Sequence, residues 1–232
     1  MQPAGGWDGF TVGAEAGVQF QRSRWKTTSY LNPIGGPTPF LSNPKSYFTS
    51  VTAQLGPVFG YRRQVSEFWV LGVETDFHLQ DNTATKSTLP GTDNSPTPTG
   101  TLQSQVKARW NASLRAKAGY LFRPDLMAYL TGGPSLQRLE DTGSCFSDTN
   151  FCNPAFGTEQ SSKARNKLGW TAGAGLEKMI GNNTFVHVEY RFADYGAENR
   201  TLFTPNPIAT FGLANEVRSQ THALTLGFSK QF

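Results

Sequence analysis

The 232-residue sequence has no long apolar run, and charged residues make up only 16% of it. Without a stretch of about 18 apolar residues it contains no membrane-spanning helix. Lysine and arginine are scattered and the net charge is only +4, so we expect no nucleic-acid partner. Aromatic residues reach 12% and recur throughout, which argues against long disorder.

Cysteine and histidine are scarce, which limits the chemistry available to the chain. Cys145 and Cys152 form neither a CxxC pair nor a Cys/His cluster, so we expect no zinc site. We interpret them as a small loop disulfide made in an oxidising compartment, with two free thiols as the alternative. The three histidines lack partners at metal-ligand spacing and there is no GxSxG motif. We therefore predict no metal, no cofactor and no catalytic residue.

What the sequence does contain is an alternation of apolar and other residues, which predicts β-strands. From Phe10 to Phe20 the even positions are apolar and the odd positions are not. In 105–122 the predicted apolar face includes Val106, Ala108 and Trp110, and the other face carries charged residues including Lys107. The pattern predicts eight strands, at 10–20, 47–62, 68–80, 105–122, 126–138, 166–178, 184–193 and 218–232.

The connections between these strands alternate in length. Four are long and polar, and three are short turns. The long ones are 22–46, 81–104, 139–165 and 194–217, and the short ones are 63–67, 123–125 and 179–183. Strict alternation places every long loop at one end and both termini at the other, as in outer-membrane barrels.

Two further features favour a barrel with its apolar faces outward. Aromatic residues gather near the ends of the apolar faces, as expected at membrane interfaces. The polar faces mix glycine with large charged residues, which suits the narrow interior of eight strands. A soluble ligand-binding barrel would turn its charges outward, and it is the alternative.

We therefore predict an all-β fold, an eight-stranded antiparallel up-and-down transmembrane β-barrel with four long extracellular loops and three short periplasmic turns. Residues 1–8 would form an N-terminal periplasmic segment and 9–232 a single barrel domain. The start of the chain does not match a secretory signal, so we expect a cytosolic protein or numbering from a mature or recombinant start.

The charged residues of the polar faces predict a network inside the barrel. Its expected members are Glu15, Glu74, Asp76, Arg109, Arg115, Lys117, Glu189 and Arg191. Strand adjacency invites Glu74 or Asp76 to pair with Arg115 or Lys117. We interpret the network as a static polar core that plugs the barrel, because unpaired buried charges are costly. A gate on a narrow ion path is the alternative.

Three segments resemble the Omp25/RopB-like group of small outer-membrane β-barrel proteins, the outer membrane immunogenic proteins, whose architecture is similar to the OmpA transmembrane domain. They are GWDGFTVG at 6–13, HVEYRFADYG at 187–196 and LTLGFSKQF at 224–232. The resemblance covers nearly the whole chain, and the long loops depart from it. It implies a bacterial outer-membrane location and a terminal Phe232 that the barrel-assembly machinery reads as an assembly signal.

The expected role is structural or surface-interacting in the Gram-negative envelope, and not enzymatic. The alternatives are a narrow pore for ions or small solutes and a lipid-modifying enzyme. The long loops could meet a surface or envelope protein. Outer-membrane lipid and lipopolysaccharide are expected partners, because Arg22, Arg24 and Lys26 could contact their phosphates; a merely solvated loop base is the other interpretation.

Overall fold

The computed structural model describes residues 6–31, 37–38, 44–87, 89–90, 102–145, 159–181, 183–202 and 212–232. These ranges contain eight long strands and one short one: β1 (Gly9–Leu31), β2 (Pro37–Thr38), β3 (Lys45–Gln64), β4 (Trp69–Lys86), β5 (Leu102–Arg123), β6 (Leu126–Cys145), β7 (Glu159–Gly181), β8 (Thr184–Leu202) and β9 (Gly212–Gln231). No helix in this part of the chain is long and apolar enough to cross a membrane.

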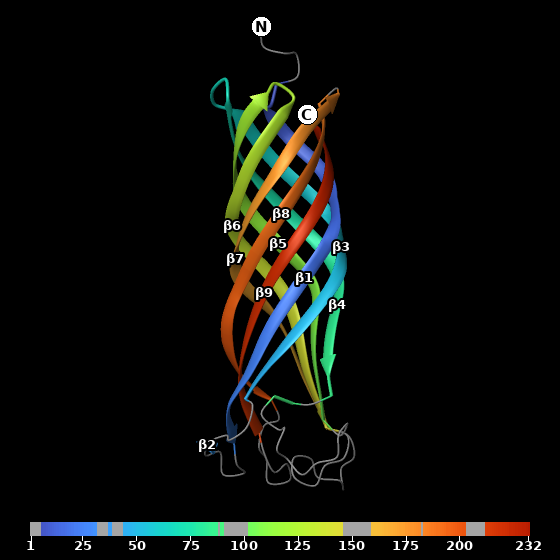
Figure 1. Ribbon diagram of the computed structural model, residues 1–232, viewed down its shortest axis with the longest axis vertical. Coiled ribbons are helices and arrows are strands. Elements are labelled where there is room, and N and C mark those ends of the chain that lie inside the picture. Colours follow the sequence, from blue (N-terminus) through green and yellow to red (C-terminus); the bar gives the residue numbers. More distant parts are fainter. Residues whose placement is uncertain are drawn as a thin grey trace.

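The long strands form one closed antiparallel barrel (Figure 1). Each pairs with its neighbour in sequence, and β1 also pairs with β9, which closes the sheet. The short turns and both termini share one end, here called the turn end, and the longer connections leave from the opposite loop end. The predicted eight-stranded up-and-down topology is confirmed.

The strands are about twice as long as a bilayer crossing requires. A transmembrane strand needs about 9–11 residues, whereas β1 and β7 have 23 each. The extra residues extend the strands at the loop end. The predicted bounds of the long loops are therefore too wide, because regular strand pairing continues into each of them. In 22–46, for example, Lys26 pairs with Lys45. The same holds for 81–104, 139–165 and 194–217.

Next to the turn end, the outer surface is an apolar band. It is formed by the outward side chains of 10–20, 51–61, 69–79, 110–122, 126–136, 168–180, 184–192 and 222–228. Leu55 and Leu226 are each 62% exposed there, while Glu15 and Arg115 point inward and are 1% exposed. The soluble-barrel alternative requires the opposite arrangement and is wrong.

Aromatic rings border the apolar band on both sides. Near the turn end Trp69 contacts Tyr120, with ring centroids 5.4 Å apart. Near the other border Trp170 contacts Phe192, with ring centroids 5.3 Å apart. Such belts suit the two interfaces of a membrane, where rings contact both apolar and polar surroundings.

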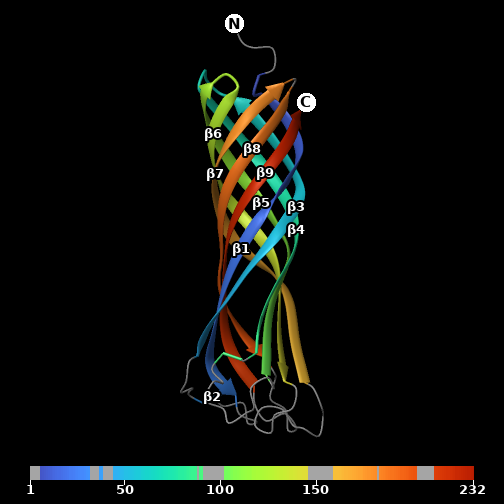
Figure 2. The ribbon, with the colours of Figure 1, turned by 45° about the vertical axis from the view of Figure 1, so that its right-hand side comes forward.

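Beyond the band, the strands continue as what we call the sleeve, whose outer face is polar and whose interior holds an apolar cluster among polar side chains. The sleeve comprises 21–31, 45–50, 80–86, 102–109, 137–145, 159–167, 193–202 and 212–221. Trp25, Leu139 and Val217 point inward there and are no more than 1% exposed, while Arg22 and Lys163 are exposed outside. Apolar side chains inside and a polar outer face are the pattern of β-sheets in water. The strands converge as they enter this part (Figure 2).

A β-bulge in β5 shifts the orientation of its side chains at the border of the band. Between Ala108 and Trp110, β5 has one residue more than β6. An extra residue reverses which side chains point inward beyond it. The predicted orientations of Val106, Ala108 and Lys107 are therefore wrong, because Val106 and Ala108 are buried inside the barrel and Lys107 is on the outer face.

Candidate functional site

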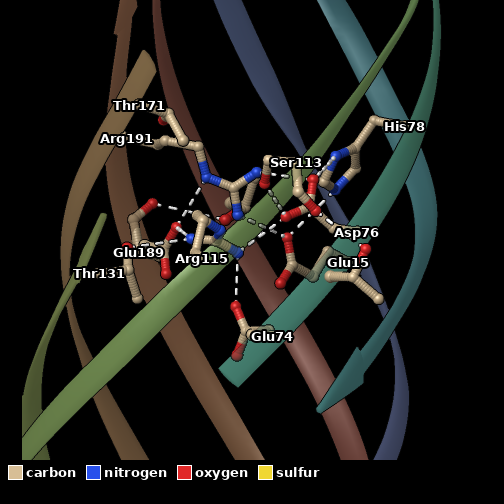
Figure 3. A network of polar contacts seen from close by, with 12 residues as sticks. Glu15, Glu74, Asp76, His78, Ser113, Arg115, Thr131, Thr171, Glu189 and Arg191 are labelled. Carbon is tan, nitrogen blue, oxygen red and sulfur yellow. Dashed lines mark hydrogen bonds and ion pairs between the residues drawn. The ribbon is translucent and has the colours of Figure 1, made fainter. Parts of the chain in front are cut away.

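The polar interior of the apolar band centres on Arg115 of β5 (Figure 3). Its Nη2 lies 2.5 Å from Oε1 of Glu74 and 2.9 Å from Oδ2 of Asp76, and its Nη1 lies 2.5 Å from Oε1 of Glu189. These acids come from β4 and β8, so a single guanidinium joins three strands. Its fork of five donors suits several carboxylates at once.

Arg191 of β8 provides the second centre of the network. Its Nη1 lies 3.1 Å from Asp76, its Nη2 3.4 Å from Glu15, and its Nε 2.8 Å from Glu189. Asp76 and Glu189 are thus shared with Arg115. Sharing acids between two guanidiniums couples four strands through charged hydrogen bonds.

Two histidines also contact Glu15 of β1. His78 Nε2 lies 3.1 Å from Oε2 of Glu15, and its Nδ1 lies 3.2 Å from Asp76. His187 Nε2 lies 3.1 Å from the other oxygen of Glu15. Both carboxylate oxygens of Glu15 are therefore occupied by imidazoles.

A second group of charges lies nearer the turn end. Lys117 Nζ lies 2.7 Å from Glu177 and 3.2 Å from Glu74. Arg62 forms an ion pair with Glu177 and donates from Nη2 to Oε1 of Gln231 at 2.7 Å. Across both groups, five carboxylates face four permanent cations and two histidines. Each buried charge therefore has an opposite partner, which offsets its desolvation.

Interior glycines make room for these side chains. A Cβ at Gly227 would lie 2.2 Å from Cε1 of His187 and 3.0 Å from Cγ of Glu15. A Cβ at Gly175 would lie 2.5 Å from the Tyr129 ring. Both positions face large interior side chains, so their glycines are required for packing.

The structure brings together all but one of the predicted network residues. Those that meet are Glu15, Glu74, Asp76, Arg115, Lys117, Glu189 and Arg191. Arg109 does not join them, because the bulge in β5 turns it outward. Its side chain is 48% exposed and lies 3.5 Å from Asp81 and 3.8 Å from Glu140.

The predicted set also missed four members of the network: Arg62, His78, Glu177 and His187. The alternation of inward and outward residues along each strand is the signal that would have predicted them. Arg62 lies two residues after Gly60 on the inward side of β3. Across the described part of the chain, no group of three or more His, Cys, Asp and Glu side chains is arranged to hold a metal ion.

An apolar cluster closes the interior at the turn end. Its buried members are Trp7, Val70, Leu121, Met127, Tyr129 and Phe185. Trp7 comes from the segment before β1, and its indole N–H donates to the carbonyl of Pro124 at 3.0 Å. The Arg62 guanidinium lies 4.8 Å from the Trp7 ring and 3.9 Å from the Phe185 ring, which joins the cluster to the charge network.

A second apolar cluster closes the interior within the sleeve. It contains Trp25, Phe48, Leu89, Val106, Ala108, Leu139 and Val217. Leu89 comes from the connection between β4 and β5, is 1% exposed, and packs within this cluster. Thr27 donates a hydrogen bond to the carbonyl of Pro90, the residue after Leu89. A connecting segment is thereby fixed inside the barrel.

Uncharged polar side chains fill the layer between the network and the sleeve cluster. Asn111 donates to Gln19 at 3.2 Å, and Asn82 donates to Gln21 at 3.3 Å. One cavity in this layer measures about 10 Å³, and one beside the charges measures about 20 Å³. Each has room for about one water molecule.

Two predicted features lie at the edges of the barrel. Cys145 ends β6, and Cys152 falls in 146–158, so the predicted disulfide lies outside the described residues. Phe232 follows β9 and is 76% exposed, and its N–H donates to the carbonyl of Phe10 at 2.9 Å. The terminal residue is therefore held to the first strand, and its role as an assembly signal stays a prediction.

A closed sheet with an apolar band outside and paired charges inside defines an integral β-barrel membrane protein. The chain belongs to the outer membrane protein beta-barrel domain family, whose model matches residues 2–232. The outer-membrane location and the predicted family resemblance are confirmed.

Three relatives are themselves named as outer-membrane proteins. The 31 kDa outer-membrane immunogenic protein of Brucella melitensis is 31% identical over 140 residues, which cover 60% of this chain and 52% of that protein. The 25 kDa outer-membrane immunogenic protein of Brucella abortus is 40% identical over 98 residues, 42% of this chain and 38% of that protein. The 22 kDa outer membrane protein of Rhizobium leguminosarum is 26% identical over 204 residues, which cover 87% of this chain and 71% of that protein. The chain thus spans about half or less of the two Brucella proteins.

Two solved structures share the fold alone. The outer membrane protease OmpT of Escherichia coli matches with a TM-score of 0.57 and 10% identity, over 97% of each chain. The outer membrane protein OprG of Pseudomonas aeruginosa matches with a TM-score of 0.55 and 11% identity, over 98% of this chain and 99% of that one.

Proposed function

We propose that this protein is a sealed, non-catalytic barrel that holds its long connections away from the outer membrane for interaction with other surface molecules. The observation that carries the proposal is closure at both ends. Trp7 closes the turn end and Leu89 closes the sleeve, and the charges between them are paired. Cavities that hold about one water each support a core without a continuous water path.

The sleeve gives this proposal its surface role. Its outer face is polar and an apolar cluster lies inside it, so it is suited to stand in water beyond the apolar band. Outer-membrane barrels have short periplasmic turns and longer extracellular loops. We therefore infer that the sleeve and long connections are extracellular and the termini periplasmic. The relatives' name, outer-membrane immunogenic protein, supports a role without catalysis.

Planar-bilayer recording tests the sealed interior. We expect the wild-type chain to show no steady conductance, and a Trp7→Ala/Leu89→Ala/Arg115→Ala triple variant to conduct, because both closing side chains and the central side chain of the network are removed. A Phe10→Ala variant, which changes an exposed side chain of the band, is the matched control and should stay closed. Steady channels in the wild-type protein would contradict the proposal.

A narrow ion path is the second candidate. The observation that favours it is the polar interior, which continues from Arg62 through Arg115 to the Gln and Asn layer without an apolar break. Under this function, small solutes would swell wild-type liposomes and Arg115→Ala would change the single-channel conductance. A lipid-modifying activity would instead alter the mass of lipopolysaccharide in cells that express the chain.

A further inference from the structure

Five basic side chains gather on the outer face of the sleeve, next to the apolar band. This basic patch consists of Arg22, Arg24, Lys26, Lys45 and Arg218, on the adjacent strands β1, β3 and β9. It begins two residues beyond Phe20, an outward apolar residue of the band. The patch therefore lies where the headgroups of membrane lipids begin.

The register of the strands places like charges directly opposite each other within the patch. Arg24 of β1 faces Arg218 of β9, and Lys26 of β1 faces Lys45 of β3. Like charges in directly opposed positions destabilise a sheet. Two such pairs on one strand are an arrangement that an anion bound between them would relieve.

Only part of this charge is balanced by the protein itself. Glu216 stands opposite Lys26 in the register with β9, but its carboxylate lies 3.2 Å from Arg24, and Asp194 lies 2.5 Å from Arg218. For the other three bases of the patch, no ion pair with a carboxylate forms within the described ranges. The Arg22 guanidinium instead lies 4.7 Å from the centre of the Tyr47 ring.

The opposite wall of the barrel is different at the same depth. Lys107 of β5 faces Glu140 of β6, and Arg109 lies near both Glu140 and Asp81. Opposite charges therefore face each other at these two bases. Arg138 and Lys163 of the same wall form no ion pair within the described residues, but neither stands opposite another base in the strand register. Directly opposed bases, among the described residues, are thus a feature of the patch.

We propose that the basic patch is a binding site for the phosphate groups of a phosphorylated glycolipid in the adjacent leaflet. Phosphate oxygens accept charge-assisted hydrogen bonds from guanidinium and ammonium groups, and would separate the two like-charge pairs. The acyl chains of the same lipid would lie against Phe20 and Val51 of the apolar band, which face outward and are exposed. The site rests on the proposed orientation of the barrel, and it does not depend on a sealed interior.

Binding of diphosphorylated lipid A to the full chain in neutral detergent tests the site. We expect a Lys26→Gln/Lys45→Gln double variant to bind about tenfold more weakly or worse, because each base near a lipid surface contributes about 1 kcal/mol. The matched control is Lys107→Gln/Arg109→Gln, which removes two bases that have acids beside them on the opposite wall and should bind like wild type. Equal affinities for the patch variant and the control would overturn the proposal.

Two further measurements distinguish a lipid site from a site for free anions and from a purely structural patch. Dephosphorylated lipid A should bind wild type as weakly as lipid A binds the patch variant. Inorganic phosphate at the same phosphate concentration should not displace the lipid; full displacement would show a site for free anions and overturn the assignment. Without lipid, the patch variant should unfold at the same or a higher temperature, because like-charge contacts are removed. A lower unfolding temperature would indicate a structural role and count against the proposal.

Discussion

At the scale of single residues, Arg115 is one of two arginines that hold the interior charge network together. Its guanidinium contacts three acids on two strands, and two of those acids also contact Arg191. Removing one partner of a buried pair is far more costly than the net contribution of the pair, because charges are left uncompensated.

We expect Arg115→Ala to lower the free energy of unfolding by about 3–5 kcal/mol. The measurement is the urea midpoint of the gel-mobility difference between folded and boiled samples in detergent. Arg109→Ala is the control: its side chain is 48% exposed, so a change within about 1 kcal/mol is expected. Similar midpoints for both variants would show that the interior network contributes little to stability.

At the scale of strands, the alternation of the sequence is sufficient for the half that crosses the membrane. Phe10 to Phe20, for example, has one apolar and one polar face throughout, and both the predicted strand and its predicted orientation are confirmed. The sleeve escapes prediction because its strands keep the same period while the apolar side changes from outside to inside. Trp25, Leu139 and Val217 are the available signal, at inward positions within predicted loops.

The seven network residues that the structure brings together follow from the same alternation, and Arg109 marks where it fails. A single extra residue in β5 reverses the pattern, and the local composition does not predict it. The sequence also does not predict which side chains of different strands come into contact. The contact of His78 with Glu15, on β4 and β1, depends on barrel closure and register.

The bulge in β8 between Asp194 and Ala197 is an element whose stability should depend on pH. Gly196 has a φ of 64°, and its N–H donates to Asp194 at 2.8 Å. Burial raises the pKa of Asp194, but hydrogen bonds from Arg218, Gln220 and the Gly196 backbone outweigh it and lower that pKa below its ordinary value. The bulge lies beyond the apolar band, within reach of water.

Because the folded-state pKa of Asp194 is the lower one, its contribution to stability is present above about pH 4. It should be lost as the pH falls through the folded-state value. We expect the exchange protection of the Gly196 amide, corrected for the intrinsic rate, to fall in that range. Asp194→Asn should show weak protection at every pH. A wild-type profile without pH dependence would contradict this assignment.

At the scale of the whole molecule, the same eight strands serve two surroundings. They present an apolar exterior beside the turn end, and beside the loop end a polar exterior around an interior in which an apolar cluster lies among polar side chains. The two parts differ in how the strands pair. β1 pairs with β9 from Thr11 to Leu31, but pairing of β3 with β4 stops at Gln54 and Gln80, and pairing of β7 with β8 stops at Trp170 and Asp194. The sleeve therefore consists of two hydrogen-bonded sheets, β8-β9-β1-β3 and β4-β5-β6-β7, which continue directly from the closed barrel.

The reversal of faces has a spectroscopic consequence, because it sorts the five tryptophans by location. Trp69, Trp110 and Trp170 lie on the outer face in contact with other rings of the belts. Trp7 and Trp25 are at most 2% exposed inside the two closing clusters. In bilayers of lipids brominated on their acyl chains, we expect the fluorescence of the first three to be quenched and that of the other two to persist. The double substitution Trp7→Phe/Trp25→Phe should abolish the persistent emission, and emission that survives it would show that a belt tryptophan is shielded from lipid.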